Sequence, residues 1–247
     1  MLAIIGGSGL YSLGQDFHLL DQKSRETPYG ETSADVLLGR WHELEIAFLP
    51  RHGAGHRVPP HAVNYRANLW ALKQAGVNRI IAVNAVGGIG PDMAPCTLAL
   101  PHQLIDYSSG REHSFFGGDD GIVQHVDFSQ PYSASLRSCL QQAAAQLDLE
   151  LVASATYGCT NGPRFETAAE IERMRRDGCS IVGMTGMPEA GLARELEIEY
   201  ACLALVVNWA AGVDDSEISM EEIMANLEQG IGQLSPLLLA AARLIEA

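Results

Sequence analysis

The sequence predicts an α/β fold: a single domain, residues 1–247, in which helices flank a central, mostly parallel mixed sheet. Short apolar runs alternate along the chain with segments of helical periodicity, and this alternation is typical of helices packed on a parallel sheet. The 247 residues fall within the range of one large domain with an ample core. No repeat, low-complexity segment or linker divides the chain.

Eight segments are short enough and rich enough in Val, Ile, Leu or Ala to form buried strands. In chain order they are Leu2–Ile5, Ala34–Leu38, Ile46–Leu49, Arg79–Val83, Thr97–Leu100, Leu151–Ala155, Ile181–Met184 and Ala201–Val207.

Five further segments have the apolar spacing of helices. They are Val63–Ala75, Ser133–Leu147, Thr167–Arg176, Pro188–Leu196 and Met220–Glu246. Gly76 and Gly178 predict the ends of the first and third. Within the last, which is long and amphipathic, Gly230, Gly232 and Pro236 predict interruptions.

Composition excludes several function classes. Hydrophobic residues make up 47% and charged residues 19% of the chain, an ordinary globular balance. The net charge of −14 argues against nucleic acid or an anionic membrane surface as a partner, since both select a basic stripe. It leaves a small anionic substrate open, because a pocket can be locally basic. No apolar run reaches the roughly 18 residues of a membrane span. Leu2–Ile5 is too short for a signal-peptide core, so we expect a cytoplasmic protein.

The five cysteines are odd in number, widely spaced and without a CxxC pair: Cys96, Cys139, Cys159, Cys179 and Cys202. We therefore expect buried or free thiols, and no metal site.

Two motifs follow predicted strands. In Gly6–Gly9 (GGSG), glycine lets backbone N–H groups approach an anion and Ser8 adds a hydroxyl donor. Taken alone, this cluster is better explained by a tight turn, and it lacks the GxGxxG pattern and the P-loop lysine. Arg51 and His52 follow Ile46–Leu49, at a strand end where open α/β sheets place ligands. An arginine there can hold phosphate in a bidentate fork. A surface salt bridge for Arg51 and a capped loop position for His52 are equally good explanations.

A third motif carries a family resemblance. The segment 160–167 (TNGPRFET), read with Met184, Thr185 and Asn208, resembles the nucleoside-binding signature of the trimeric nucleoside phosphorylases, which include purine nucleoside and 5'-methylthioadenosine phosphorylases. GGSG at 6–9, RHGAGH at 51–56 and NYRAN at 64–68 resemble that family too. The likeness runs to about residue 225 and is closest to the methylthioadenosine branch. It implies the nucleoside phosphorylase fold, inorganic phosphate as co-substrate, no other cofactor and a homotrimer.

The resemblance implies a phosphate site made by Ser8, Arg51, His52 and Thr185. It also places Asn84 and the backbone of Ala85 between phosphate and ribose, although many methylthioadenosine phosphorylases have Thr at the place of Asn84. Met184 would pack beneath the ribose, whereas an isolated Met at a strand end is usually a core residue.

Three positions around the base depart from the methylthioadenosine pattern. Enzymes of the family that cleave 6-aminopurines carry an Asp near N7 and a second acidic residue two positions later; here Asn208 and Ala210 stand there. The amide of Asn208 can donate to N7 and to O6 of a 6-oxopurine. Glu166 follows Phe165, as in the 6-oxopurine enzymes, and its carboxylate would accept the N1–H of hypoxanthine while Phe165 stacks on the base. The alternative for Glu166 is a helix N-terminal carboxylate stabilised by the dipole.

The 5' end of the substrate has its own set of residues. Met220, Ile223 and Met224 fall at the helix start that lines the alkylthio pocket in the resembled family, and such side chains suit a thioether. Without that resemblance, an apolar trio at helical spacing is usually core. His125 lies in a segment that, in the family, reaches into the neighbouring subunit's site.

Together these residues predict phosphorolysis of S-methyl-5'-thioinosine to hypoxanthine and 5-methylthioribose 1-phosphate, in purine salvage. Asn208 would act as the catalytic residue by stabilising the departing purine. Phosphorylases of 5'-methylthioadenosine, or of inosine and guanosine, are the nearest alternatives. A nucleosidase that uses water and a nucleoside-binding protein without turnover are alternatives from other classes, which Arg51, His52 and Thr185 disfavour.

Overall fold

The computed structural model describes residues 1–23, 26–117, 123–215 and 217–246. The strands are β1 Leu2–Gly6, β2 Phe17–Lys23, β3 Glu26–Thr27, β4 Gly30–Glu31, β5 Val36–Trp41, β6 Leu44–Pro50, β7 Arg79–Gly88, β8 Leu98–Asp106, β9 Leu151–Cys159, β10 Ile181–Gly183 and β11 Glu199–Trp209. The helices are η1 Pro60–Ala62, α1 Tyr65–Gln74, α2 Ala134–Gln146, α3 Ala168–Arg176, α4 Gly186–Glu195 and α5 Met220–Glu246.

Within the described residues, one nine-stranded sheet forms the centre, in the order β10-β9-β8-β11-β7-β1-β6-β5-β2. The pairs from β11 through β7 and β1 to β6 are parallel, as are β10–β9 and β9–β8. The pairs β8–β11, β6–β5 and β5–β2 are antiparallel. Strand β10 also pairs antiparallel with β7, so β10, β9, β8, β11 and β7 close into a ring. The predicted α/β fold, a single domain with a mostly parallel mixed sheet, is confirmed.

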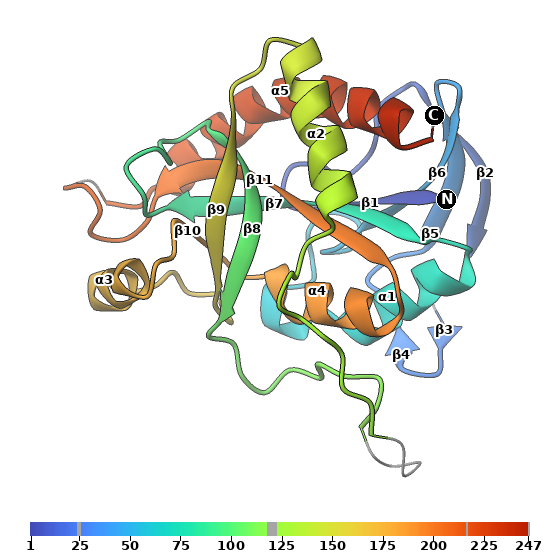
Figure 1. Ribbon diagram of the computed structural model, residues 1–247, viewed down its shortest axis with the longest axis horizontal. Helices are drawn as coiled ribbons and strands as arrows, with labels where there is room; N and C mark the ends of the chain where they lie inside the picture. Colours follow the sequence, from blue (N-terminus) through green and yellow to red (C-terminus); the bar gives the residue numbers. More distant parts are fainter. Residues whose placement is uncertain (24–25, 118–122, 216, 247) are drawn as a thin grey trace.

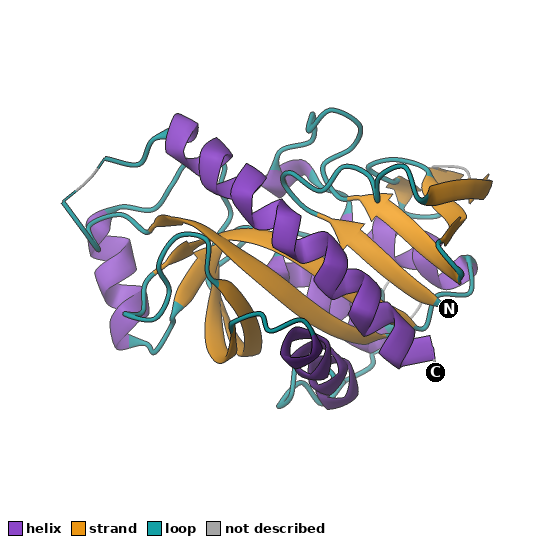
Figure 2. Cartoon of the chain, turned by 90° about the horizontal axis from the view of Figure 1, so that it is seen from above, coloured by secondary structure: helices purple, strands orange, loops and turns teal. Residues whose placement is uncertain are grey.

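Helices cover both faces of this sheet (Figures 1 and 2). Side chains of α2 and α5 pack with one apolar cluster, and those of α1 and α4 pack with another. Strand β1 shows how the pleat divides the two: Leu2 and Ile4 belong to the α5 side, Ala3 and Ile5 to the α1 side, and all four are fully buried. A strand covered on both faces has no polar alternation, which is why β1 is a continuous apolar run. Over the described residues, no helix combines the length and apolar character that crossing a membrane needs.

The structure corrects several predicted boundaries. Strand β7 continues through 84–88, beyond the predicted strand Arg79–Val83, and β8 and β9 are also longer than predicted. Strands β2, β3 and β4 were not predicted. β2 is a largely exposed edge strand with the sequence FHLLDQK, so it lacks the buried apolar run on which the other predictions rest.

The C-terminal helix α5 is continuous, so the predicted interruptions within it are wrong. Gly230 lies against β11: a Cβ there would come within 2.3 Å of the Leu205 side chain. This glycine permits close packing and does not end the helix. Pro236 lies inside the helix as well, although proline supplies no backbone N–H donor.

Candidate active site

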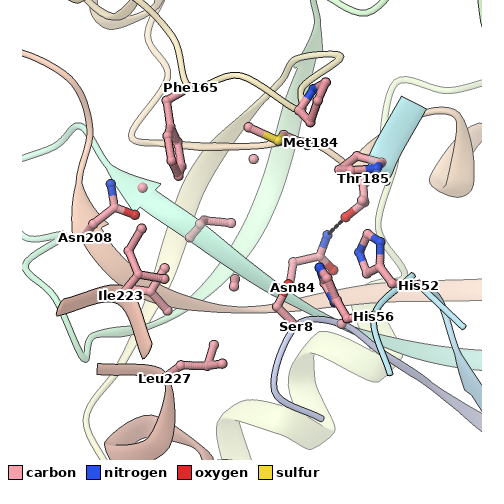
Figure 3. A pocket seen from close by; sticks show the side chains of 18 of the residues that line it. Ser8, His52, His56, Asn84, Phe165, Met184, Thr185, Asn208, Ile223 and Leu227 are labelled. Carbon is pink, nitrogen blue, oxygen red and sulfur yellow. Dashed lines mark hydrogen bonds between the residues drawn. The ribbon is translucent and has the colours of Figure 1, made fainter. Parts of the chain in front are cut away.

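A cavity of about 520 Å³ opens where β1, β7, β10 and β11 end. Figure 3 shows its labelled side chains in two groups, with Ser8, His52, Asn84 and Thr185 on one side and Phe165, Asn208 and Ile223 on the other. The carboxyl ends of the parallel strands β1, β7 and β11 meet at one edge of the sheet. The antiparallel pairing of β10 with β7 brings Thr185 beside Asn84. Every site residue predicted from the sequence lines the cavity except His125.

The loop after β1 approaches the sheet closely. A Cβ on Gly7 would lie 2.3 Å from the Val83 carbonyl oxygen and 3.1 Å from Nη1 of Arg51. Gly9 has φ +84° and packs on the α5 side chain of Leu227. Both positions therefore require glycine, and Ser8 between them lines the cavity.

Arg51, at the end of β6, is fully buried. Its Nε and Nη2 donate to the two carboxylate oxygens of Glu189, each at 2.7 Å. Nη1 donates to the Val83 carbonyl at 2.9 Å, and Nη2 also reaches Oδ1 of Asn84 at 3.4 Å. The edge formed by Nε and Nη2 is thus occupied, and the structure differs from the expected bidentate fork toward phosphate. Nη1, beside Gly7, is the nitrogen left to face an anion.

His52 is held as a neutral ring. Burial, with a smaller contribution from the charge of Arg51, lowers its pKa to about 4. Nδ1 lies 2.8 Å from the Val58 carbonyl oxygen, which can only accept, so Nδ1 carries the proton. Nε2 of the neutral ring therefore bears a lone pair and is the nitrogen available to a ligand. The ring of His56 lies beside it at a tilt of 35°, with centroids 4.5 Å apart.

Asn84 of β7 and Thr185, the residue before α4, are joined by a hydrogen bond. Nδ2 of Asn84 donates to Oγ1 of Thr185 at 2.8 Å (Figure 3), and it lies 3.4 Å from the Tyr157 hydroxyl. Both side chains are buried and line the cavity, as does Ala85. Since the amide gives its proton to Oγ1, the Thr185 hydroxyl is free to donate its own proton to a ligand.

Phe165 and Asn208 lie on the opposite side of the cavity (Figure 3), and Glu166, which follows Phe165 in the chain, also lines it. Oε1 of Glu166 accepts a hydrogen bond from the Thr160 hydroxyl at 2.6 Å, which fixes the carboxylate. The capping box of α3 is made by Thr167 and Glu170, so Glu166 does not cap this helix. Asn208 is buried, and its Nδ2 donates one proton to the Trp209 carbonyl at 2.7 Å. A second amide proton and the side-chain oxygen remain for a ligand.

The remaining lining is largely apolar. Met184 packs on Gly162, which has φ +60° and leaves no room for a Cβ. Ile223 is 8% exposed, whereas Met220 and Met224 are 59% and 53% exposed. The start of α5 therefore gives the cavity an open, thioether-rich rim.

A model of the phosphorylase superfamily matches residues 1–243. This chain belongs to that superfamily. A probable S-methyl-5'-thioinosine phosphorylase from Pseudomonas syringae pv. tomato is 53% identical over 99% of this chain and 98% of its own. A 6-oxopurine nucleoside phosphorylase from Pyrococcus furiosus is 44% identical over 99% of this chain and 92% of its own.

Among solved structures, a mutant adenosine/methylthioadenosine phosphorylase from Schistosoma mansoni in complex with methylthioadenosine superposes with a TM-score of 0.93. It is 31% identical, over 99% of this chain and 91% of that chain. The predicted family and the predicted phosphorylase fold are confirmed.

Several residues of this phosphorylase site were missed by sequence reasoning. Tyr11, His56, Arg57 and Leu227 line the cavity, and Glu189 holds Arg51 from behind it. His56 and Arg57 stand in the RHGAGHR run, so proximity to Arg51 was an available signal. Glu189 follows Arg51 by 138 residues, and nothing local indicates the pairing.

His125 is exposed in the loop between β8 and α2 and lies outside this cavity. Its predicted place beside a neighbouring subunit's site stays a prediction.

Proposed function

We propose that the protein catalyses phosphorolysis of S-methyl-5'-thioinosine, giving hypoxanthine and 5-methylthioribose 1-phosphate. The observation that carries this proposal is that Phe165 and Asn208 lie across the cavity from His52 (Figure 3). Glu166 follows Phe165 in the chain, Arg51 precedes His52, and both also line the cavity. One end of the cavity is built for a 6-oxopurine and the other for an anion.

The base end favours hypoxanthine because of its hydrogen-bond polarity. The fixed carboxylate of Glu166 accepts from N1–H of a 6-oxopurine, while adenine presents a lone pair at N1 and would repel it. The free amide proton of Asn208 donates to N7 or O6, and it strengthens as negative charge arrives on the leaving purine. Ala210, which is buried, leaves no second carboxylate for an exocyclic amine.

The phosphate end supplies donors from four segments. Ser8, Nη1 of Arg51 and the Thr185 hydroxyl donate to phosphate oxygens, with the backbone around Asn84 and Ala85 beside them. Neutral His52 presents a lone pair at Nε2, which accepts the hydroxyl of a hydrogen phosphate dianion. The group is thereby oriented with an unprotonated oxygen toward C1'.

The reaction then needs one displacement. A phosphate oxygen forms a bond to C1' as the bond from C1' to N9 breaks, through an oxocarbenium-like transition state. The proton of the hydrogen phosphate ends on the purine, so that charge and atoms balance. Catalysis comes from positioning and electrostatics. We propose that no cofactor or metal takes part and that phosphate is a co-substrate.

The 5' end favours a thiomethyl group. Ile223, Met220 and Met224 offer apolar and thioether surfaces to it, whereas a 5'-hydroxyl needs a polar partner. The exposure of the two methionines leaves surface that a neighbouring subunit can cover. We therefore include a homotrimer in the proposal, with His125 closing the neighbour's 5' pocket, and a cytoplasmic location.

One experiment tests the proposal. Base release is measured from 5'-methylthioinosine, 5'-methylthioadenosine and inosine, each with and without phosphate. We expect phosphate-dependent release of hypoxanthine, fastest from 5'-methylthioinosine. Release without phosphate would identify a nucleosidase, and binding without release would identify a nucleoside-binding protein. Preference for 5'-methylthioadenosine or for inosine would support the corresponding phosphorylase instead.

A further inference from the structure

Arg111, in the segment between β8 and α2, lies outside the cavity and behind its wall. Its Nη2 donates to three carbonyl oxygens: those of Met184 at 2.8 Å, Asn161 at 3.0 Å and Thr160 at 3.2 Å. Its Nη1 donates to the Met187 carbonyl oxygen. One guanidinium therefore gathers four backbone carbonyls.

These carbonyls belong to two segments of the chain that supply lining residues to different parts of the cavity. Residues 184–187 lead from β10 into the first residues of α4 and contain Met184 and Thr185, which Figure 3 shows at the cavity. Residues 160–161 begin the segment that leads to Phe165 and Glu166. Besides Arg111, the Cys159 thiol also bonds to both segments, because its Sγ accepts from the Met187 N–H at 3.2 Å and lies 3.9 Å from the Thr160 carbonyl oxygen. A backbone bond lies next to these contacts, from the Thr160 N–H to the carbonyl of Gly183, the last residue of β10, at 2.9 Å.

The arrangement suits a guanidinium and no smaller group. Four carbonyl oxygens that face one point would repel one another unless a cation with several donors lies between them. Guanidinium supplies five N–H donors in a fixed plane, so it sets the angles between the two segments as well as their spacing. The Tyr65 ring, with its centroid 5.3 Å from Arg111, supports the plane from α1.

We propose that Arg111 is a positioning residue: it locks the phosphate- and ribose-binding segment 184–187 against the base-binding segment 160–166. The proposal rests on the proposed function, because it takes segment 184–187 to bind phosphate and ribose and segment 160–166 to bind the base. Misplacement of either segment separates the reacting groups, and a shift of about 1 Å costs about 100-fold in rate.

Arg66 provides a matched control. It is also a partly buried arginine over a tyrosine ring, 5.3 Å from the Tyr29 centroid. Among the described residues, the buried Nε atoms of Arg66 and Arg111 both have no hydrogen-bond partner. Arg66 donates to the Ser114 carbonyl at 3.4 Å, in the same segment as Arg111, and pairs with Glu112. Arg66 does not line the cavity. Its loss removes comparable packing and leaves segments 160–166 and 184–187 untouched.

The test compares R111A, R111K and R66A with the unaltered protein in steady-state phosphorolysis. For R111A we expect kcat/KM to fall about 100-fold, with higher KM for both phosphate and nucleoside. R111K keeps the charge but has no planar fork, so we expect a smaller loss. R66A should stay within about threefold of the unaltered protein. A partly unfolded variant would instead show lower kcat with both KM values unchanged.

Added guanidinium gives an independent measurement. At concentrations far below those that unfold proteins, it should restore R111A activity in a saturable manner, and it should leave R66A unchanged. Three results would overturn the proposal: R111A within threefold of the unaltered protein, a loss confined to kcat, or inhibition of R111A by guanidinium without rescue. A failure of the proposed function would show in the unaltered protein, as cleavage of a different nucleoside. A failure of the present proposal would show only in the comparison of R111A with the unaltered protein.

Discussion

Glu189 binds Arg51 through both carboxylate oxygens, with Nε and Nη2 at 2.7 Å, and both side chains are fully buried. The Tyr200 hydroxyl donates to the same carboxylate at 2.8 Å. The ion pair neutralises the guanidinium and holds it edge-on, so that Nη1 is the part of Arg51 turned toward the Gly7 loop. Arg51 therefore contributes an oriented N–H donor to the phosphate site, because Glu189 already balances its charge.

Removing one partner of this pair should be costly. E189Q leaves the Arg51 charge buried without its counterion, and we expect the free energy of unfolding to fall by about 3–5 kcal/mol. Urea unfolding measures this loss. E43Q is the matched control, because Glu43 pairs with Arg243 on the surface, where solvent screens the interaction and a much smaller loss is expected. Equal losses for the two variants would contradict the finding that the Arg51 pair is the buried, stabilising one.

Replacement of Arg51 should affect the KM for phosphate and the KM for the nucleoside differently. R51A removes Nη1 from the anion end, so we expect the phosphate KM to rise at least about tenfold while the nucleoside KM changes far less. Initial rates over a grid of both concentrations give the two constants. Unchanged saturation by phosphate would place the anion site elsewhere.

Base preference tests Glu166 and Asn208. Two mismatched buried contacts, each worth about 1–3 kcal/mol, predict at least about a 100-fold higher kcat/KM for 5'-methylthioinosine than for 5'-methylthioadenosine. The double variant N208D/A210D should move activity toward the adenine nucleoside, incompletely while Glu166 remains. Comparable efficiency of the unaltered protein on both nucleosides would refute these roles.

His52 predicts a dependence of stability on pH. Burial lowers its folded-state pKa to about 4, from 6.5 in the unfolded chain. The unfolded chain therefore binds more protons between these values, so the stability contribution is complete above pH 6.5 and is lost as pH falls toward 4. The shift corresponds to about 3 kcal/mol. Urea unfolding from pH 4 to 7 should show a shallower slope in H52Q, while H18Q, an exposed variant on β2, should follow the unaltered protein.

Arg57 predicts a dependence on salt. It is exposed at the cavity, and within the described residues no salt bridge pairs it with an acidic side chain. The chain carries a net charge of −14, so an approaching phosphate meets a repulsive field that this cation offsets locally. R57Q should lower kcat/KM for phosphate several-fold at low ionic strength, and the difference should shrink as salt is added. A salt-independent difference would make Arg57 a direct ligand instead.

Assembly is tested through His125. If it closes a neighbour's 5' pocket, H125A should impair 5'-methylthioinosine more than inosine, and dilution to monomers should abolish turnover of the methylthio-nucleoside. A cyclic trimer provides three equivalent interfaces with closed symmetry. Sedimentation and activity measured over the same concentration range would check this. A fully active monomer would leave His125 an ordinary loop residue.

The sequence by itself determined the fold class, the positions of the main strands along the chain and the residues that follow these strands. Buried parallel strands are continuous apolar runs, and open α/β sheets place ligands at their carboxyl ends, so local pattern indicated Ser8 and His52. The family resemblance added Thr185 and Asn208, and all four line the cavity. The family resemblance then indicated that Glu166 and Asn208 contact the purine base. Strand β2 escaped because an exposed edge carries no such pattern.

Tertiary structure alone decided how these side chains are held. The partner of Arg51 is 138 residues away, and the carbonyls that Arg111 gathers come from segments 49 to 76 residues beyond it. Gly230 looked like a helix break, and only its contact with Leu205 shows that it serves packing. Local sequence encodes periodicity and turn chemistry. Which distant donor meets which acceptor depends on the folded chain, because buried polar groups bind whichever partner the packed sheet and helices bring within reach.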